Sequence, residues 1–161
     1  VRQLSNDQIR AVFTGKVRNW RELGGADVPI TVVNKAEGRS TLELFLEYFG
    51  LRNSQIAADV IIGDNQQGLK TVAGNRGAIG YVSIGAAEYE AARGVPIRQL
   101  SMQGIEASVE NVRAGRYPLS RPLNLILWSS PRGMVLDYIN FARSSAVDDL
   151  IERQFFVPPS R

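Results

Sequence analysis

The sequence predicts an α/β fold in which helices cover both faces of a mainly parallel or mixed sheet. Short apolar runs of strand length alternate with segments of helical periodicity along almost the whole chain, which is the pattern of α/β proteins. Several of the predicted helices end at a glycine, the residue that most readily adopts the left-handed conformation found at helix C-termini. The chain has 161 residues, of which 44% are apolar, so it can enclose one hydrophobic core.

The predicted elements follow one another in a regular order. Ser5-Asn-Asp-Gln8 is a capping-box pattern that starts the first helix. Strands are expected at 30–34, 60–62, 78–83, 95–100 and 123–127. Further helices are expected at about 40–49, 65–72, 84–93, 108–114 and 147–155, with one more that begins at Ser130-Pro131. Gly77 precedes the third strand and Gly80 lies within it, and a glycine inside a strand often marks a close approach of two backbone segments.

The composition excludes several kinds of site. The chain has no His and no Cys, which rules out His-based catalytic triads, zinc sites of His and Cys, and disulfides within it. The net charge is +3, and the 16 Arg and 3 Lys are spread without a cluster, so nucleic-acid binding is not predicted. No apolar run approaches the roughly 20 residues that span a bilayer. Because the chain opens at Val1 without an initiator Met, we expect a processed or truncated piece of a longer protein.

An anion-binding site is predicted where the helix over 40–49 begins. The first turn of a helix carries N–H groups without partners and a partial positive charge, and both favour a bound oxyanion. Ser40 and Thr41 add hydroxyl groups there, and Lys35 and Arg39 add formal charge. The site follows a predicted strand, and open α/β sheets bind their ligands at the carboxyl ends of strands. The alternative is that Ser40 or Thr41 only caps the helix.

Seven short motifs occur along the chain in a fixed order. They are Leu4-Ser-Asn-Asp-Gln-Ile9, Val12-Phe13-Thr-Gly15, Asn19-Trp20-Arg-Glu-Leu-Gly-Gly25, Pro29-Ile-Thr-Val-Val33, Glu37-Gly-Arg-Ser-Thr41, Gly77-Ala-Ile-Gly-Tyr-Val82 and Tyr117-Pro-Leu-Ser-Arg-Pro-Leu123. In this order they cover essentially the whole chain. The sequence resembles the phosphate-binding proteins of ABC-type phosphate importers, beginning at the second lobe of that family.

The resemblance implies a type II periplasmic solute-binding fold, in which two lobes close on a phosphate-like oxyanion. It implies no catalysis, no cofactor and no metal. The permease of the importer would be the partner of the binding protein. The resemblance also implies a periplasmic or otherwise exported location.

Four residues would hold the anion according to the resemblance. Lys35 stands where the family has an Arg, and Arg39, Ser40 and Thr41 stand where it has a Ser-Gly-Thr run. Only Thr41 matches the family by type. Lysine cannot form the two-pronged contact that arginine makes with two oxygens. The ligand therefore stays open between phosphate, sulfate and a larger phosphorylated molecule, and so does the direction of Arg39.

The resemblance also divides the chain into two parts. Residues 1–117 correspond to the whole second lobe with its anion half-site, and residues 118–161 to the segment that returns to the first lobe. Most of that first lobe would precede Val1. We therefore expect residues 118–161 to expose apolar surface, to be covered by a partner in a homo-oligomer, by a domain swap or by a retained N-terminal fragment.

Two other classes of function remain as alternatives. The altered residues of the half-site would suit a sensor or scaffold that kept the fold and lost the ligand. Its recognition surface would use aromatic residues that we otherwise expect in the core, namely Trp20, Tyr81, Tyr117 and Trp128. A phosphoester-processing enzyme would need carboxylates, and those considered are Glu37, Asp64, Asp148 and Asp149. Asp64 is the best candidate among them, although the role of helix cap is favoured for it.

Overall fold

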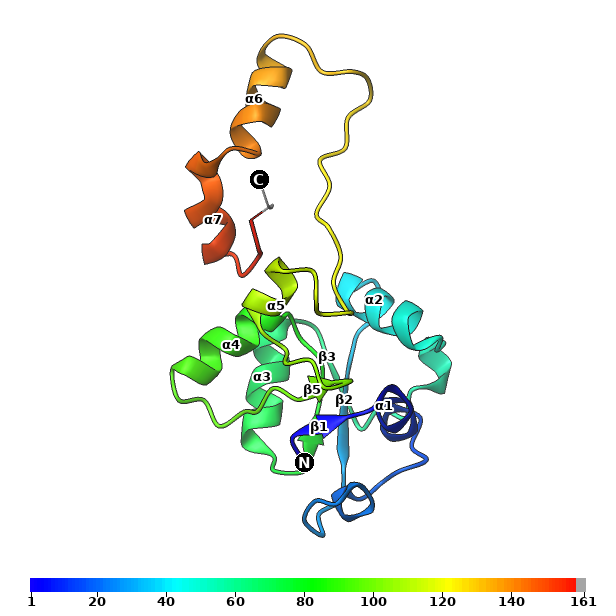
Figure 1. The fold of residues 1–161 in the computed structure, drawn as a ribbon. Coiled ribbons are helices and arrows are strands. Elements are labelled where there is room, and N and C mark those ends of the chain that lie inside the picture. The colour runs from blue at the N-terminus through cyan, green and yellow to red at the C-terminus, as the bar shows by residue number, and fades with distance from the viewer. Residues whose placement is uncertain (159–161) are drawn as a thin grey trace.

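A three-stranded parallel sheet stands at the centre of the structure, a computed structural model that describes residues 1–158. Its strands are β2 (Thr31–Lys35), β3 (Val60–Ile62) and β4 (Ala78–Ile79), and β2 lies in the middle (Figure 1). Val33 lies opposite Val60 in the register between β2 and β3. Because the strands are parallel, their carboxyl ends meet at the same edge of the sheet.

Helices cover both faces of this sheet, as predicted. Helices α1 (Asn6–Phe13) and α2 (Ser40–Phe49) lie on one side, and α3 (Asn65–Gly74) and α4 (Ile84–Ala92) lie on the other (Figure 1). Both α2 and α3 contact β2. The α/β class predicted from the sequence is confirmed.

Local signals in the sequence set the ends of the first two helices. The Ser5 side chain accepts a hydrogen bond from the Gln8 N–H at 3.2 Å, and the Gln8 side chain accepts one from the Ser5 N–H at 2.8 Å. This is the predicted capping box. Gly50 ends α2 at a φ of +61°, in the left-handed region that glycine adopts without strain.

The main core lies between α1, α2 and the sheet. Phe13, Phe45 and Phe49 are buried in it, and the rings of Phe13 and Phe45 have centroids 4.6 Å apart. The Phe45 ring stacks on Tyr81 at 4.2 Å with 7° between the planes. A smaller cluster on α3 and α4 consists of Leu69, Ala86 and Ala87. Packing on both faces holds the sheet in place, and with it the edge where the strands end.

A second, two-stranded sheet joins the start of the chain to its middle. Strand β1 (Gln3–Leu4) pairs in parallel with β5 (Ser101–Met102), and helix α5 (Val109–Arg113) follows. The strand predicted at 95–100 is wrong, because pairing begins only at Ser101. Pro96 lies within that segment and lacks the N–H that a ladder requires. Antiparallel pairing in residues 1–158 is limited to two isolated bridges, Asn19–Pro29 and Met102–Ile105.

The C-terminal part differs most from expectation. The strand predicted at 123–127 is wrong, because no strand of the described chain lies beside this segment and a lone segment cannot form a ladder. Helix α6 (Met134–Ala142) begins after Gly133 rather than at Pro131, and α7 (Asp148–Arg153) follows it. Three short 3₁₀ helices complete the described elements: η1 (Trp20–Leu23), η2 (Asn53–Gln55) and η3 (Ser145–Val147).

Large apolar side chains are exposed along this C-terminal part. Trp128 is 103% exposed, Ile126 91% and Met134 87%. The expected core position of Trp128 is therefore wrong, whereas Trp20, Tyr81 and Tyr117 contribute to the main core. Exposed apolar surface in this part of the chain is confirmed. The division at residues 117 and 118, and the identity of whatever covers that surface, stay predictions.

The end of the chain returns to the body of the protein. Arg113 of α5 forms an ion pair with Glu152 of α7, with 2.9 Å between nitrogen and oxygen. The Phe155 ring lies 5.3 Å from that of Tyr89, on α4. The extended crossing at 118–133 therefore stands out from the body, whereas α7 and the residues after it contact the body (Figure 1).

Two backbone segments approach closely at Gly77. A Cβ at this position would collide with the carbonyl oxygen of Pro29. We therefore expect Gly77→Ala to lower the free energy of unfolding by about 1–3 kcal/mol. The matched control is Gly74→Ala, since a Cβ at Gly74 meets nothing within 4 Å and alanine favours a helix. Urea denaturation gives the free energy of unfolding of both variants, and equal values for the two would contradict the prediction.

Candidate functional site

Polar side chains gather where the three central strands end. Lys35 is the last residue of β2, Asn65 follows β3, and Ser83 follows β4. The parallel register places these three positions at one edge of the sheet. Ligands of open α/β sheets bind at such edges.

Lys35 is the most unusual residue of this edge. It is only 3% exposed, and its Nζ donates a hydrogen bond to Asn65 Oδ1 at 2.7 Å. It forms no ion pair with a carboxylate of residues 1–158. Burial lowers the pKa of Lys35 below its usual value; the charge of Asp64 opposes this shift, and that of Arg39 adds to it. An ammonium has three N–H donors, so Asn65 fills only one of them.

Asn65 and Ser83 extend this contact across the sheet edge. The Asn65 Nδ2 donates to Ser83 Oγ at 3.0 Å. Neither residue is among the anion ligands predicted from the sequence. The available signal was their place, because Asn65 lies three residues after the strand predicted at 60–62 and Ser83 ends the strand predicted at 78–83, and ligand-contacting residues of α/β folds lie near strand ends.

Helix α2 begins without a side-chain cap. Arg39 occupies the N-cap position and makes no capping hydrogen bond. The alternative that Ser40 or Thr41 merely caps this helix is therefore wrong. The carbonyl of Arg39 accepts hydrogen bonds from the N–H groups of Leu42 and Glu43. The N–H groups of Ser40 and Thr41 have no hydrogen-bond partner in residues 1–158. The first turn of α2 keeps the free donors that an oxyanion would accept.

Arg39 lies beside the end of β3. A Cβ built at Gly63 would be 3.8 Å from Arg39 Nη2, so the guanidinium passes over a position that has no side chain. The side chain is exposed, but its charge is near enough to lower the pKa of Lys35. Two cations therefore lie close together next to the uncapped start of α2.

A second chain of hydrogen bonds holds the loop between Lys35 and Arg39. Tyr81 Oη donates to Asn34 Oδ1 at 2.6 Å, Asn34 Nδ2 donates to Asn53 Oδ1 at 3.1 Å, and Asn53 Nδ2 donates to Glu37 Oε1 at 2.9 Å. Burial raises the pKa of Tyr81 to about 12, so its hydroxyl remains a donor at neutral pH. The network links the main core to the loop that follows β2.

The carboxylates considered for catalysis lie in separate places and have ordinary structural partners. Asp64 caps α3, since its Oδ1 accepts the N–H of Gln67 at 2.8 Å, as expected. Glu37 accepts from Asn53, and Asp149 pairs with Arg153 at 3.0 Å. Asp148 begins α7. Residues 1–158 contain no group of three or more acidic side chains placed to hold a metal ion.

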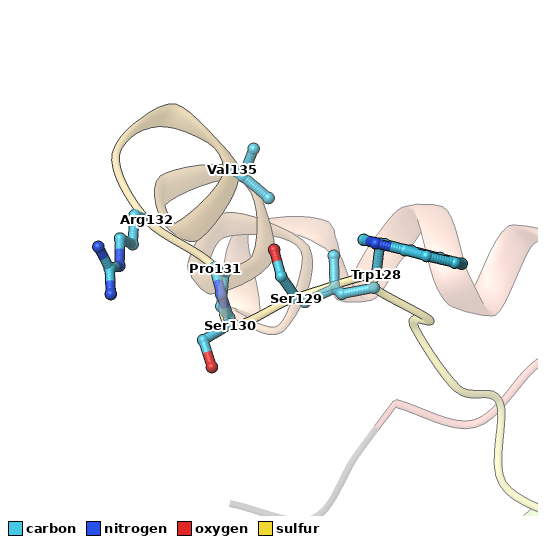
Figure 2. A pocket seen from close by; sticks show the side chains of 7 residues that line it. Trp128, Ser129, Ser130, Pro131, Arg132 and Val135 are labelled. Atoms are coloured by element: carbon cyan, nitrogen blue, oxygen red, sulfur yellow. The ribbon is translucent and has the colours of Figure 1, made fainter.

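Two open hollows lie away from this edge. One, of about 680 Å³, is lined by residues 127–132 and Val135. Figure 2 shows that the side chains of Trp128 and Arg132 point in opposite directions there. The other, of about 650 Å³, lies between α4, α5 and α7. Neither includes the polar residues at the strand ends. No helix within residues 1–158 has the length and apolar character needed to cross a membrane.

The fold and the strand-end residues define a class of protein. It is an α/β domain with parallel strands, a buried lysine and an uncapped helix start at one sheet edge, which together are suited to bind an anion. Comparison with known proteins gives the family: residues 1–146 match the family model of the PBP superfamily domain, and the chain belongs to that superfamily. The family resemblance of the motifs is confirmed.

Relatives in sequence carry consistent names. The chain is 26% identical over 159 residues to the phosphate-binding protein PstS of Bacillus subtilis, covering 98% of this chain and 51% of that protein. It is 28% identical over 136 residues to the phosphate-binding protein PstS 2 of Streptococcus pneumoniae, covering 80% of this chain and 45% of that protein. The chain thus spans about half the length of the curated relatives it matches.

Solved structures agree with these relatives. One, from Clostridium perfringens, was assigned as a phosphate ABC transporter substrate-binding protein and holds bound phosphate; it matches with a TM-score of 0.79 and 28% identity over 99% of this chain and 64% of that one. An ABC-type phosphate transport receptor from Vibrio cholerae matches with a TM-score of 0.80 at 24% identity, over 99% of this chain and 65% of that one. The second likeness supports the fold alone.

Proposed function

We propose that this chain forms part of a solute-binding protein of an ABC importer and binds phosphate or a similar oxyanion without catalysis. One observation carries the proposal: Lys35 is buried, forms no ion pair in residues 1–158 and has two unfilled donors, next to a helix start that no side chain caps. Buried charges are normally paired, because taking a lone charge out of water is costly. A bound anion would supply the missing partner.

The four residues predicted from the sequence would bind the anion together. Lys35 and Arg39 would provide the positive charge that an oxyanion requires. Ser40 and Thr41 would contribute backbone N–H groups and hydroxyls at the positive end of the α2 dipole. Lys35 contacts a neutral amide, and the acidic residues of the described chain form no metal-binding group, so we propose capture of the ligand and no reaction.

The relatives support the wider setting. Proteins named for phosphate binding and for ABC phosphate transport match nearly the whole chain. We therefore propose the importer's permease as the downstream partner, and a periplasmic or otherwise exported location. A sensor or scaffold that lost its ligand is the second candidate, and the replacement of the family's Arg by Lys35 is the observation that favours it.

Titration with inorganic phosphate tests the proposal. We expect phosphate to shift the backbone amide signals of Ser40 and Thr41 in NMR spectra of the chain, with sulfate added as competitor. Thr41→Val should weaken the response, whereas Ser120→Ala, which changes an exposed hydroxyl outside the site, should not. Unchanged signals up to high phosphate concentration would refute anion binding and favour the sensor or scaffold.

A further inference from the structure

We propose that Asn65 and Ser83 are positioning residues of the anion site, which hold the Lys35 ammonium at the sheet edge and keep its charge available. This proposal rests on the proposed function. Its basis is a continuous contact chain: Lys35 Nζ to Asn65 Oδ1 at 2.7 Å, and Asn65 Nδ2 to Ser83 Oγ at 3.0 Å. Lys35 ends β2, and Asn65 and Ser83 follow β3 and β4, so the chain of contacts joins the carboxyl ends of the three strands.

The neutrality of Asn65 is central to this role. A carboxylate in its place would pair with Lys35 and cancel the charge that an anion needs. The adjacent residue, Asp64, does carry a carboxylate, but its Oδ1 accepts the N–H of Gln67 and it forms no ion pair in residues 1–158. Two consecutive residues therefore have different roles: the acidic Asp64 caps α3, and the neutral Asn65 contacts Lys35.

Ser83 holds the end of the Asn65 amide that does not meet the lysine. An asparagine side chain presents an oxygen acceptor on one side and an NH₂ donor on the other. Because the Lys35 ammonium can only donate, it requires the Oδ1 atom, and Ser83 Oγ accepts from the Nδ2 that remains. Ser83 also stands at the N-cap of α4, yet it makes no capping hydrogen bond with its side chain. Its hydroxyl serves Asn65 instead of the helix.

Because Lys35 is buried, its hydrogen bond to Asn65 matters for the position of the ammonium. With 3% of the residue exposed, solvent can compensate only in part for a lost protein acceptor at the ammonium. Asn65 is its one hydrogen-bond partner in residues 1–158, and it leaves two donors unfilled. Asn65 holds the ammonium in place with a neutral acceptor. The other N–H groups of the ammonium remain free to contact an oxyanion.

Substitution of Asn65 tests the proposal in the full chain, with inorganic phosphate as the probe. We expect Asn65→Asp to lower the phosphate affinity at least about tenfold, because the new carboxylate neutralises Lys35. Gln66→Glu adds the same charge one residue along on an exposed side chain. It replaces the hydrogen bond that Gln66 Nε2 donates to Glu90 with repulsion, away from Lys35, and should change the affinity much less. Circular dichroism and urea denaturation establish that both variants fold.

Two further variants separate positioning from general stability. Ser83→Ala should weaken phosphate binding about threefold, and Ser83→Thr, which keeps the hydroxyl, should restore it. The ¹⁵Nζ signal of Lys35 gives a direct readout, since Asn65→Ala and Ser83→Ala should shift it and Gln66→Ala should not. A structural role without positioning would leave this signal and the affinity unchanged.

The outcomes distinguish the two proposals. If the unaltered chain binds phosphate and the Asn65 and Ser83 variants bind it equally well, positioning is refuted and anion binding stands. If the unaltered chain does not bind phosphate, the proposed function fails. In that case the Lys35 ¹⁵Nζ signal alone tests whether Asn65 and Ser83 hold the ammonium. If Asn65→Ala and Ser83→Ala leave the signal unshifted, the positioning role is refuted too.

Discussion

Lys35→Met is expected to make the unliganded protein more stable and to remove its anion binding. Lys35 is buried without an ion pair among the described residues, and burial lowers its pKa, which means that its charged form is disfavoured in the folded state. Methionine is unbranched and of similar length, so it can fill the same space without a charge. We expect the free energy of unfolding to rise by about 1–3 kcal/mol.

The measurement is urea denaturation at neutral pH, with and without inorganic phosphate. Phosphate should stabilise the unaltered protein, since a ligand that binds only the folded state favours folding, and it should have no effect on Lys35→Met. Lys70→Met, on the exposed face of α3, is the control and should behave like the unaltered protein. Reduced stability of Lys35→Met would show that the ammonium is a structural group rather than a ligand contact.

The pH dependence of stability gives the same test a second readout. The unfolded chain has Lys35 at its usual pKa of 10.5, and the folded protein has it lower. Between those two values the unfolded state binds more protons, so stability should rise with pH across this window. At pH values below both pKa values, Lys35 is charged in the folded and the unfolded state, and the buried charge lowers the stability by its full amount. Lys35→Met should lack this rise, which identifies its source.

Much of the site's framework was predictable because it depends on local signals. The Ser5 capping box and the glycine after α2 are set by residues a few positions apart, and both were found where the sequence placed them. The position of the anion site at the start of α2 follows from the order of strand, loop and helix. Such features need no knowledge of distant neighbours.

The contacts inside the site were not predictable in the same way. Asn65 contacts Lys35 across 30 residues of sequence, and Ser83 contacts Asn65 across 18. A sequence shows that a polar residue follows a strand, but not which strand lies beside it. The order β3-β2-β4 is what brings the three together. The same limit explains the error at 123–127, where a strand-like pattern has no neighbouring strand in the described chain.

The exposed apolar crossing leads to the second large expected effect. We define it as residues 123–136, which include Ile126, Trp128 and Met134. We expect the chain alone to self-associate through this segment and to bind the dye ANS, because eight large apolar side chains are exposed within it and large exposed apolar patches favour association. The double variant Ile126→Lys and Trp128→Ser should remain monomeric and bind much less dye.

The stability of the body should hardly change in this variant, by about 0.5 kcal/mol or less, because both side chains are more than 90% exposed. Ile61→Lys, which alters an apolar residue of β3 that is 68% exposed, is the control and should leave association unchanged. Trp128 provides an internal probe, since its emission should move to shorter wavelength as the protein concentration rises and its surface becomes covered. A monodisperse monomer with little dye binding would contradict the prediction. The segment would then be covered by the chain itself in solution, and not by a partner, a swapped domain or an N-terminal fragment.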